Sequence, residues 1–156
     1  MKYGFFLLSP QIDRDRSAAT VLADTIAMAE EAEGLGFDHL WVAEHHFANL
    51  SLSPSPLITL SHLAARTQRI RLGTGVLVLP LQDPMRLAEE IAYVDIVSGG
   101  RLDYGVGRGS IRAHFDGFGI PHTLVLDPAY KVFKVYRGAV TREMLEEDLQ
   151  AIAQRT

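Results

Sequence analysis

The stretch GFDHLWVAEHHF, residues 36–47, decides how this sequence folds. Residues 37–43 form a short, mostly apolar run, which is typical of a strand covered on both faces in a parallel sheet. Glu44, His45 and His46 follow where that strand should end. Because α/β proteins bind ligands at the carboxyl ends of their parallel strands, this carboxylate beside two imidazoles is a candidate functional site. The alternative is a purely structural cluster.

Composition narrows the classes of protein that the chain fits. With 156 residues, of which 47% are hydrophobic, it has the length and apolar content of about one domain with one core. The formal net charge of -4 offers no basic face for nucleic acid and no cationic helix for a membrane surface. Residues 1–10 are too short and too polar at their ends for a signal peptide or a membrane span, so we expect a cytoplasmic protein.

Cysteine is absent from the sequence. Its absence excludes disulfides, thiolate nucleophiles and zinc–thiolate sites, and we expect no metal site. Any redox chemistry must therefore come from a bound cofactor.

The first hundred residues alternate between strand and helix patterns. Strands are predicted at residues 3–8, 37–43, 70–79 and 101–106. Four strand–helix steps with short loops predict an α/β fold with a parallel sheet. They fit the opening half of a (β/α)8 barrel as well as they fit an open, doubly wound sheet.

Local signals mark where the helices begin and which faces they bury. Ser17 is the predicted N-cap of the first helix, and Asp83 followed by Pro84 begins the third. The predicted buried stripe of the first helix consists of Leu22, Ile26 and Ala29. The inner face of the second helix is predicted to be Leu57, Leu60, Leu63 and Ala64.

A second polar motif, GRGS at residues 107–110, follows the fourth predicted strand. Glycines let a ligand approach the backbone closely, and the fork of Arg108 suits phosphate or carboxylate. The alternative is an ordinary tight turn with a solvated arginine. Residues 105–109 do not make a dinucleotide-binding fingerprint, because the third glycine comes one residue early.

Three runs together resemble the bacterial luciferase-like flavin-dependent monooxygenases: FDHLWVAEHHF at 37–47, RLGTGVLVLP at 71–80 and GRLDYGVGRG at 100–109. The resemblance covers residues 1–119 with matching order and spacing. It implies a TIM-like barrel that binds reduced FMN, or a deazaflavin in some relatives. It also implies insertion of one oxygen atom from O₂ into a small organic substrate, with a flavin reductase as a further partner.

The resemblance implies roles for individual residues. His45 matches the active-site histidine beside the isoalloxazine ring, and Glu44 matches the neighbouring acid, which would orient or polarise the pocket. The implied cofactor-binding residues are Gly75, Val76, Arg108 and Gly109. The first two belong to the tip of the third strand, where the family commonly has a non-proline cis peptide bond under the flavin ring. The other two belong to the tip of the fourth strand, on the flavin side of the pocket.

The chain is shorter than the family's barrel. A complete barrel needs about 250 residues, so we expect a partial TIM-like barrel of about four N-terminal βα units. In the family, strands five to eight supply much of the phosphate site and the substrate pocket. No residue of this chain is assigned to those roles, and the sequence does not identify the substrate.

Beyond residue 119 we expect a β-hairpin and a C-terminal helix. Strands are predicted at residues 122–126 and 131–136, joined by a proline turn. Thr141 is the predicted cap of the last helix.

Part of this tail, residues 119–128 and 135–138, resembles the C-terminal end of thioredoxin-like redoxins, without a catalytic thiol. The sequence therefore predicts two domains, a luciferase-like half-barrel at 1–119 and a redoxin-like hairpin–helix tail at 120–156. Such a chain would arise as a gene fusion, a fragment or a deliberately joined sequence.

Two functions of different class follow. The chain is a reduced flavin-dependent monooxygenase, or it is a non-catalytic flavin-binding or structural remnant of one.

An open four-stranded sheet leaves unpaired backbone N–H and C=O groups at its edge. Apolar residues at the strand tips, such as Leu77 and Leu79, would also face water. We therefore expect the hairpin to add to the sheet or, preferably, two chains to form a homodimer.

Overall fold

The computed structural model describes residues 1–118, 123–126, 132–136 and 142–154. The chain divides into two compact units, Met1–Ser110 and Ile111–Thr156, which are described separately. Among the described helices, none is long and apolar enough to cross a membrane.

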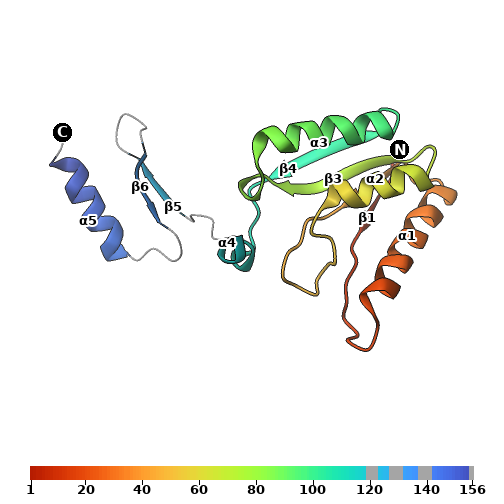
Figure 1. Ribbon diagram of the computed structural model, residues 1–156, viewed down its shortest axis with the longest axis horizontal. Helices are drawn as coiled ribbons and strands as arrows, with labels where there is room; N and C mark the ends of the chain where they lie inside the picture. The colour runs from red at the N-terminus through yellow and green to blue at the C-terminus, as the bar shows by residue number, and fades with distance from the viewer. Residues whose placement is uncertain (119–122, 127–131, 137–141, 155–156) are drawn as a thin grey trace. The chain divides into compact units, whose positions relative to one another are not determined.

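The first unit is a parallel sheet with helices between its strands (Figure 1). In chain order its elements are β1 (Gly4–Leu7), α1 (Ala18–Gly34), β2 (His39–Val42), α2 (Pro56–Arg66), β3 (Arg71–Val78), the short 3-10 helix η1 (Leu79–Leu81), α3 (Pro84–Val97) and β4 (Leu102–Gly107). The strands lie in the order β1-β2-β3-β4, and all neighbours are parallel. This sequential order is that of an opening half of a TIM-like barrel, and these four strands do not show the reversal of a doubly wound sheet.

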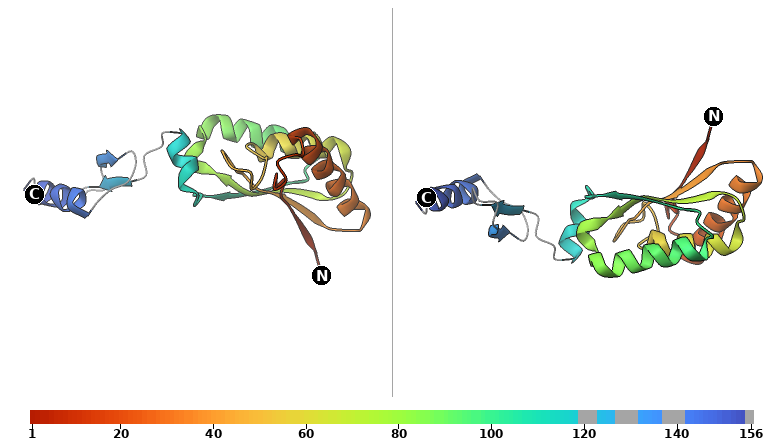
Figure 2. Two further views of the ribbon diagram at one scale, coloured as in Figure 1. Left: turned by 90° about the horizontal axis from the view of Figure 1, so that it is seen from below. Right: turned by 90° about the horizontal axis from the view of Figure 1, so that it is seen from above.

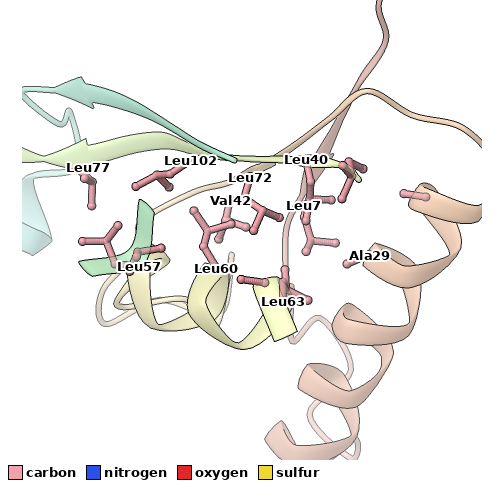
Figure 3. Packing of buried hydrophobic residues seen from close by; sticks show 14 of the residues in the cluster. Leu7, Ala29, Leu40, Val42, Leu57, Leu60, Leu63, Leu72, Leu77 and Leu102 are labelled. Atoms are coloured by element: carbon pink, nitrogen blue, oxygen red, sulfur yellow. The ribbon is translucent and has the colours of Figure 1, made fainter. Parts of the chain in front are cut away.

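Helices α1, α2 and α3 lie on the same face of the sheet (Figure 2), and the core fills the layer between them. The innermost side chains, all with 0% exposure, are Ala29, Leu40, Leu60, Leu63, Ile70 and Leu72. Figure 3 shows Leu40 and Leu72 of the strands facing Leu60 and Leu63 of α2. Side chains alternate along a strand, so Leu40 and Val42 of β2 are buried here while His39 and Trp41 are only half-buried.

The predicted helix signals of α2 and α3 are confirmed. All four predicted inner residues of α2 are buried. The carboxylate of Asp83 accepts a hydrogen bond from the Arg86 backbone N–H, with Pro84 at the first helical position. At the start of α1, the Ser17 hydroxyl accepts from the Thr20 N–H, as predicted.

The predicted buried stripe of α1 was wrong in part. Leu22 is 39% exposed, and the buried residues are Val21, Thr25, Ala29 and Ala32. The buried stripe of α1 includes a polar residue, Thr25, which the prediction left out. The Thr25 hydroxyl lies 2.8 Å from the Val21 carbonyl and 3.0 Å from Ser9 Oγ, so its hydrogen bonds are met inside the protein.

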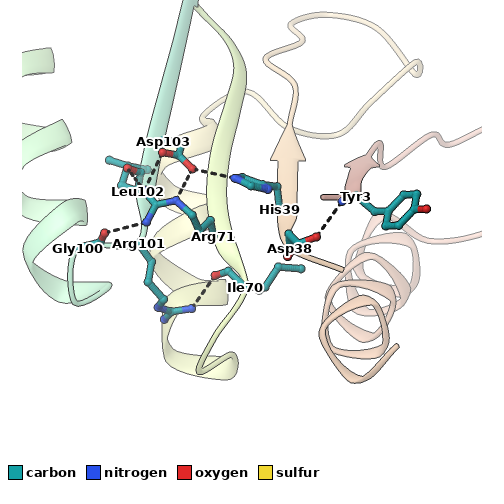
Figure 4. A network of polar contacts seen from close by, with 9 residues as sticks. All are labelled: Tyr3, Asp38, His39, Ile70, Arg71, Gly100, Arg101, Leu102 and Asp103. Atoms are coloured by element: carbon teal, nitrogen blue, oxygen red, sulfur yellow. Dashed lines mark hydrogen bonds and ion pairs between the residues drawn. The ribbon is translucent and has the colours of Figure 1, made fainter. Parts of the chain in front are cut away.

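Arg101 ties the ends of two helices to the sheet. Its guanidinium donates to the carbonyls of Ala64 and Thr67 at the end of α2, at 2.9 and 3.1 Å. It also donates to Ser98 O after α3 at 2.7 Å and to Ile70 O at 3.1 Å (Figure 4). The last carbonyls of a helix have no partner within the helix, so one planar fork here satisfies several of them.

A second polar cluster crosses the first residues of the strands (Figure 4). Arg71 of β3 donates two hydrogen bonds of 2.7 Å to the carboxylate of Asp103 on β4, and His39 of β2 lies 3.7 Å from that carboxylate. The hydrogen bond from Arg71 is the main reason why the pKa of Asp103 lies below its ordinary value. This cluster lies at the end of the sheet opposite the strand tips.

The exposed edge of the first unit differs from the prediction. Leu77 is 2% exposed, because β3 continues to Val78 and pairs it with β4, whereas Leu79 is exposed as predicted. A groove of about 710 Å³ lies between α3 and the helix-facing side of β4, lined by apolar residues that include Ile91, Tyr104 and Val106.

The second unit contains α4 (Arg112–Phe118), β5 (Thr123–Leu126), β6 (Val132–Tyr136) and α5 (Arg142–Ala153). The predicted hairpin and last helix are present, whereas α4 was not predicted. Strands β5 and β6 pair with each other, antiparallel, in a two-stranded sheet. The residues of the proline turn and Thr141 lie outside the described residues.

Replacing Arg101 with lysine should lower the free energy of unfolding by about 2 kcal/mol, because an ammonium group cannot reach carbonyls on both helix ends at once. Urea unfolding measures this change. The control is Arg86→Lys, because Arg86 is exposed and its guanidinium pairs with Glu90 one helical turn away. The control should leave the stability essentially unchanged, and equal losses in the two variants would show that the fork of Arg101 is not what matters.

Candidate active site at the strand tips

The tip of β2 carries the cluster predicted from the sequence. Glu44, His45 and His46 follow the last strand residue, Val42, after one intervening alanine. The chain then turns at Phe47, whose φ of 53° lies in the left-handed region that bulky residues seldom adopt. Unusual backbone of this kind is concentrated at ligand sites.

Glu44 is the most buried member of the cluster, with no exposed side-chain surface. One carboxylate oxygen, Oε1, lies 2.8 Å from His46 Nε2 and accepts a hydrogen bond from Gln82 Nε2 at 3.2 Å. The other, Oε2, accepts a hydrogen bond from the backbone N–H of Val78 at 2.8 Å. The carboxylate is therefore held between the tip of β2 and the end of β3.

The two histidines differ in their surroundings. His46 is buried against Glu44, whereas His45 is half-buried. The backbone N–H of His45 donates to the Ser53 carbonyl at 2.9 Å, which fixes this residue to the loop before α2. Burial is the main cause that lowers the pKa of the His45 imidazole; the nearby His46 lowers it further, and the charge of Glu44 opposes them. The lowered pKa favours the neutral form of the His45 ring, in which one nitrogen carries a proton and the other is an acceptor.

The tip of β3 has the irregular backbone that the resemblance implied. The peptide bond between Gly75 and Val76 is cis. The pairing of β3 with β4 is interrupted between Thr74 and Leu77. Across this break the Thr74 hydroxyl accepts from the Gly105 N–H and donates to its carbonyl, both at 2.9 Å.

Glycines on β4 permit this close approach of the two strands. A Cβ atom at position 105 would lie 2.5 Å from the Thr74 carbonyl oxygen, and one at position 107 would lie 2.8 Å from the Val76 side chain. No side chain fits at either position without moving its neighbour. The structure thereby brings the predicted residue Val76 against the strand that leads to Arg108.

Arg108 and Gly109 follow β4 directly. Arg108 is exposed, and within the described part of the chain its guanidinium makes no ion pair. Gly109 has a φ of 78°, in the left-handed region that favours glycine. The tip of β4 therefore presents a free positive charge on a turn.

Several neighbours of the site were not predicted from the sequence. Gln82 and the Val78 backbone bind Glu44 from positions 38 and 34 residues away. Trp41 lies in register with Gly73, and a Cβ atom at position 73 would meet its indole at 2.3 Å, so the ring lies flat on β3. No local pattern marks these contacts, because each depends on the register of strands far apart in the sequence.

The fold and the tips define the class of this molecule, an α/β protein of the TIM-like barrel type with polar groups gathered at the carboxyl ends of its strands. A family model described as luciferase-like monooxygenase matches residues 1–146. The chain belongs to the luciferase-like monooxygenase family.

Two relatives illustrate the match. The oxygenase component of the flavin-dependent trigonelline monooxygenase of Acinetobacter baylyi is 32% identical over 116 residues, which are 74% of this chain and 32% of that protein. The alkanal monooxygenase alpha chain of Photorhabdus luminescens is 31% identical over 154 residues, which are 97% of this chain and 42% of that protein. The chain thus spans less than half the length of these relatives.

Solved structures agree with this assignment. The monooxygenase RslO1 from Streptomyces bottropensis has a TM-score of 0.73 at 31% identity, over 99% of this chain and 42% of that one. The oxygenating constituent of 3,6-diketocamphane monooxygenase from Pseudomonas putida, in complex with FMN, shares the fold. Its TM-score is 0.72 at 22% identity, over 99% of this chain and 40% of that one. The coenzyme F420-dependent tetrahydromethanopterin reductase of Methanopyrus kandleri has a TM-score of 0.63 at 25% identity, over 98% of this chain and 39% of that one.

The predicted redoxin likeness of residues 120–156 is not supported. The luciferase-like family model continues past residue 119 to residue 146 and so covers most of the tail. A hairpin followed by an amphipathic helix is a combination that many α/β folds share, so a short match of this kind does not identify a family.

We expect the imidazole of His45 to titrate below the ordinary histidine pKa of about 6.5 in the folded protein. The folded state then binds fewer protons at this site than the unfolded state, so stability should decrease as the pH falls below about 6.5. NMR titration of the His45 ring, with the urea-unfolded chain as reference, measures the difference. A folded-state pKa at or above the reference would contradict the effect of burial.

Proposed function

We propose that this chain takes part in the monooxygenation of a small organic substrate, with reduced FMN and O₂ as co-substrates. One observation carries the proposal: the neutral imidazole of His45, the cis Gly75–Val76 segment and the free guanidinium of Arg108 all lie at the tips of successive strands. Membership of the luciferase-like family supports it.

The residues present are suited to a flavin. Val76 offers a half-buried apolar surface on irregular backbone, where a planar ring would rest. Arg108 and Gly109 would bind the phosphate, by the guanidinium fork and by close approach to the glycine backbone. Reduced flavin, when bound, supplies the electrons that activate O₂ for transfer of one oxygen atom to the substrate.

His45 is the proposed catalytic residue, because it is half-buried at the tip and its neutral ring is able to accept or share a proton. Glu44 is proposed to hold neighbouring residues of the site in place through its hydrogen bonds. Its carboxylate has no exposed surface, so it does not reach a ligand directly.

A deazaflavin is the second candidate cofactor, and the F420-dependent reductase that shares this fold favours including it in tests. A separate flavin reductase is proposed as a partner, in line with a relative that is named as an oxygenase component. The other class of function is a flavin-binding module without catalysis.

The test is a spectroscopic titration of the purified chain with FMN and with a deazaflavin, followed by product analysis with reduced FMN, O₂ and a panel of small aldehydes, ketones and N-heteroaromatic compounds. An oxygenated product supports the monooxygenase. Binding of FMN without any oxygenated product, with O₂ only reduced to hydrogen peroxide as the reduced FMN is oxidised to FMN, identifies a binding module. Absence of binding overturns the flavin assignment for this chain.

Replacing Arg108 with alanine should weaken FMN binding by about tenfold or more, because a charge-assisted hydrogen bond is worth roughly 1.5 to 3 kcal/mol. Riboflavin lacks the phosphate, so its affinity should change little. Fluorescence titration with both ligands measures the two affinities. Equal losses for FMN and riboflavin would remove the phosphate from the explanation.

We also propose that the chain forms a homodimer. The apolar groove between α3 and β4, with Tyr104 60% exposed, is a surface of the first unit that a second copy would cover. Sedimentation equilibrium at micromolar concentration should give twice the chain mass of 17.2 kDa. The variant Tyr104→Glu should give the mass of a single chain. The control Ile12→Glu changes a residue that is more exposed and lies outside the groove, and it should still give twice the chain mass. A monomeric parent chain would overturn the dimer.

A further inference from the structure

Glu44 joins three separate segments through one carboxylate. It receives hydrogen bonds from the Val78 N–H at the end of β3 and from Gln82 after η1, and it pairs with His46 beyond β2. We propose that Glu44 is a positioning residue, which fixes the end of β3 against the tip of β2 and so places the cis Gly75–Val76 segment relative to His45.

The backbone pairing of β3 is broken next to the cis bond. Strands β2 and β3 are paired up to Val42 and Thr74, and the pairing ends there. Beyond Thr74 the pairing of β3 with β4 is also interrupted, and it resumes only at Leu77. The segment with the cis bond is therefore the least supported part of β3 by backbone hydrogen bonds.

A side chain replaces the backbone partner at the end of β3. At Val78 a hydrogen bond towards the β2 side is restored, but its acceptor is the side chain of Glu44 and not a backbone carbonyl. A carboxylate accepts such a bond more strongly than a neutral carbonyl does. Glu44 therefore takes over the role of the missing ladder partner directly after the irregular segment.

The carboxylate of Glu44 is fully buried. An ionised carboxylate without exposed surface is costly unless its oxygens receive hydrogen bonds, and both oxygens of Glu44 receive them from the protein. All of these donors come from within the fold. The carboxylate is thereby committed to positioning, and proton exchange with a bound ligand is left to His45.

The positions of the donors give the consequence for the site. Val78 lies two residues beyond the cis bond, and His45 follows Glu44 directly in the chain. Removing the carboxylate should let the end of β3 move relative to His45. For flavin binding this inference rests on the proposed function, whereas the link between Glu44 and Val78 does not.

The test compares Glu44→Ala with Glu44→Gln in the full chain. A glutamine keeps the length of the side chain. Its carbonyl can accept from the Val78 N–H, and its NH₂ can donate to Gln82 Oε1 and to His46 Nε2, provided that the Gln82 amide is reversed and the His46 ring carries its proton on Nδ1. In Glu44→Ala the hydrogen-exchange protection of the Val78 amide should fall about tenfold or more, and the Kd for FMN should rise by about the same factor. In Glu44→Gln both quantities should stay within about threefold of the parent.

The control is Thr25→Val. Thr25 is also buried and also makes two side-chain hydrogen bonds, but to Ser9 and Val21, away from β3. Thr25→Val should lower the free energy of unfolding. The hydrogen-exchange protection of the Val78 amide, relative to that of other core amides, should stay unchanged, and so should the Kd for FMN. If Glu44→Ala does not fold, Glu44→Asp replaces it, because a side chain one methylene shorter cannot reach the Val78 N–H in the same way.

Unchanged protection of Val78 in Glu44→Ala, or in Glu44→Asp where that variant replaces it, would overturn the proposal. So would an equal loss in Glu44→Gln, since a matching side chain should restore the link, or an equal loss in Thr25→Val, which would make the effect global. If the parent chain binds no FMN, the proposed function fails, and the exchange of the Val78 amide, measured without ligand, still decides the role of Glu44.

Discussion

The fold depends on one constraint, the burial of a leucine-rich layer between the parallel sheet and its helices. Leu40 and Leu72 are side by side in the register of β2 and β3, and both have no exposure. A shift of one residue in either strand would turn these side chains to the opposite face of the sheet. The register is therefore fixed by the core, and with it the level at which each strand ends.

From that register follows the assembly of the site. Because β2, β3 and β4 are held at fixed levels, the residues beyond their ends come together although they are about 30 residues apart in the chain. The tips themselves have few backbone hydrogen bonds, and side chains supply the missing ones. Thr74 bridges the break between β3 and β4, and Glu44 bridges β2 and β3. In this way a regular sheet ends in an irregular, polar edge.

The two ends of the sheet differ in how their charged groups are paired. At the beginning of the strands, Arg71 and Asp103 neutralise each other, and Arg101 satisfies the last carbonyls of α2. At the tips, Arg108 makes no ion pair among the described residues, and burial lowers the pKa of the His45 imidazole. In TIM-barrel enzymes in general, the ends of the strands that carry the active site are the carboxyl ends, and the residues at the amino ends contribute to stability.

The sequence by itself determined the features that depend on a few adjacent residues. The caps at Ser17 and Asp83, the buried face of α2 and the place of the tip after β2 all follow from spacing over one or two helical turns, and each was predicted. The family resemblance added the position of the cis bond, which no local pattern indicates.

Only the tertiary structure decided the features that depend on distant neighbours. Thr25 belongs to the buried face of α1, in place of Leu22, because Ser9 lies within hydrogen-bonding distance. Glu44 bonds to Val78 because the core sets the register of β2 and β3. The physical reason is the same in both cases: a buried polar group must find a partner, and the partner is chosen by the packing of segments that the sequence does not place side by side.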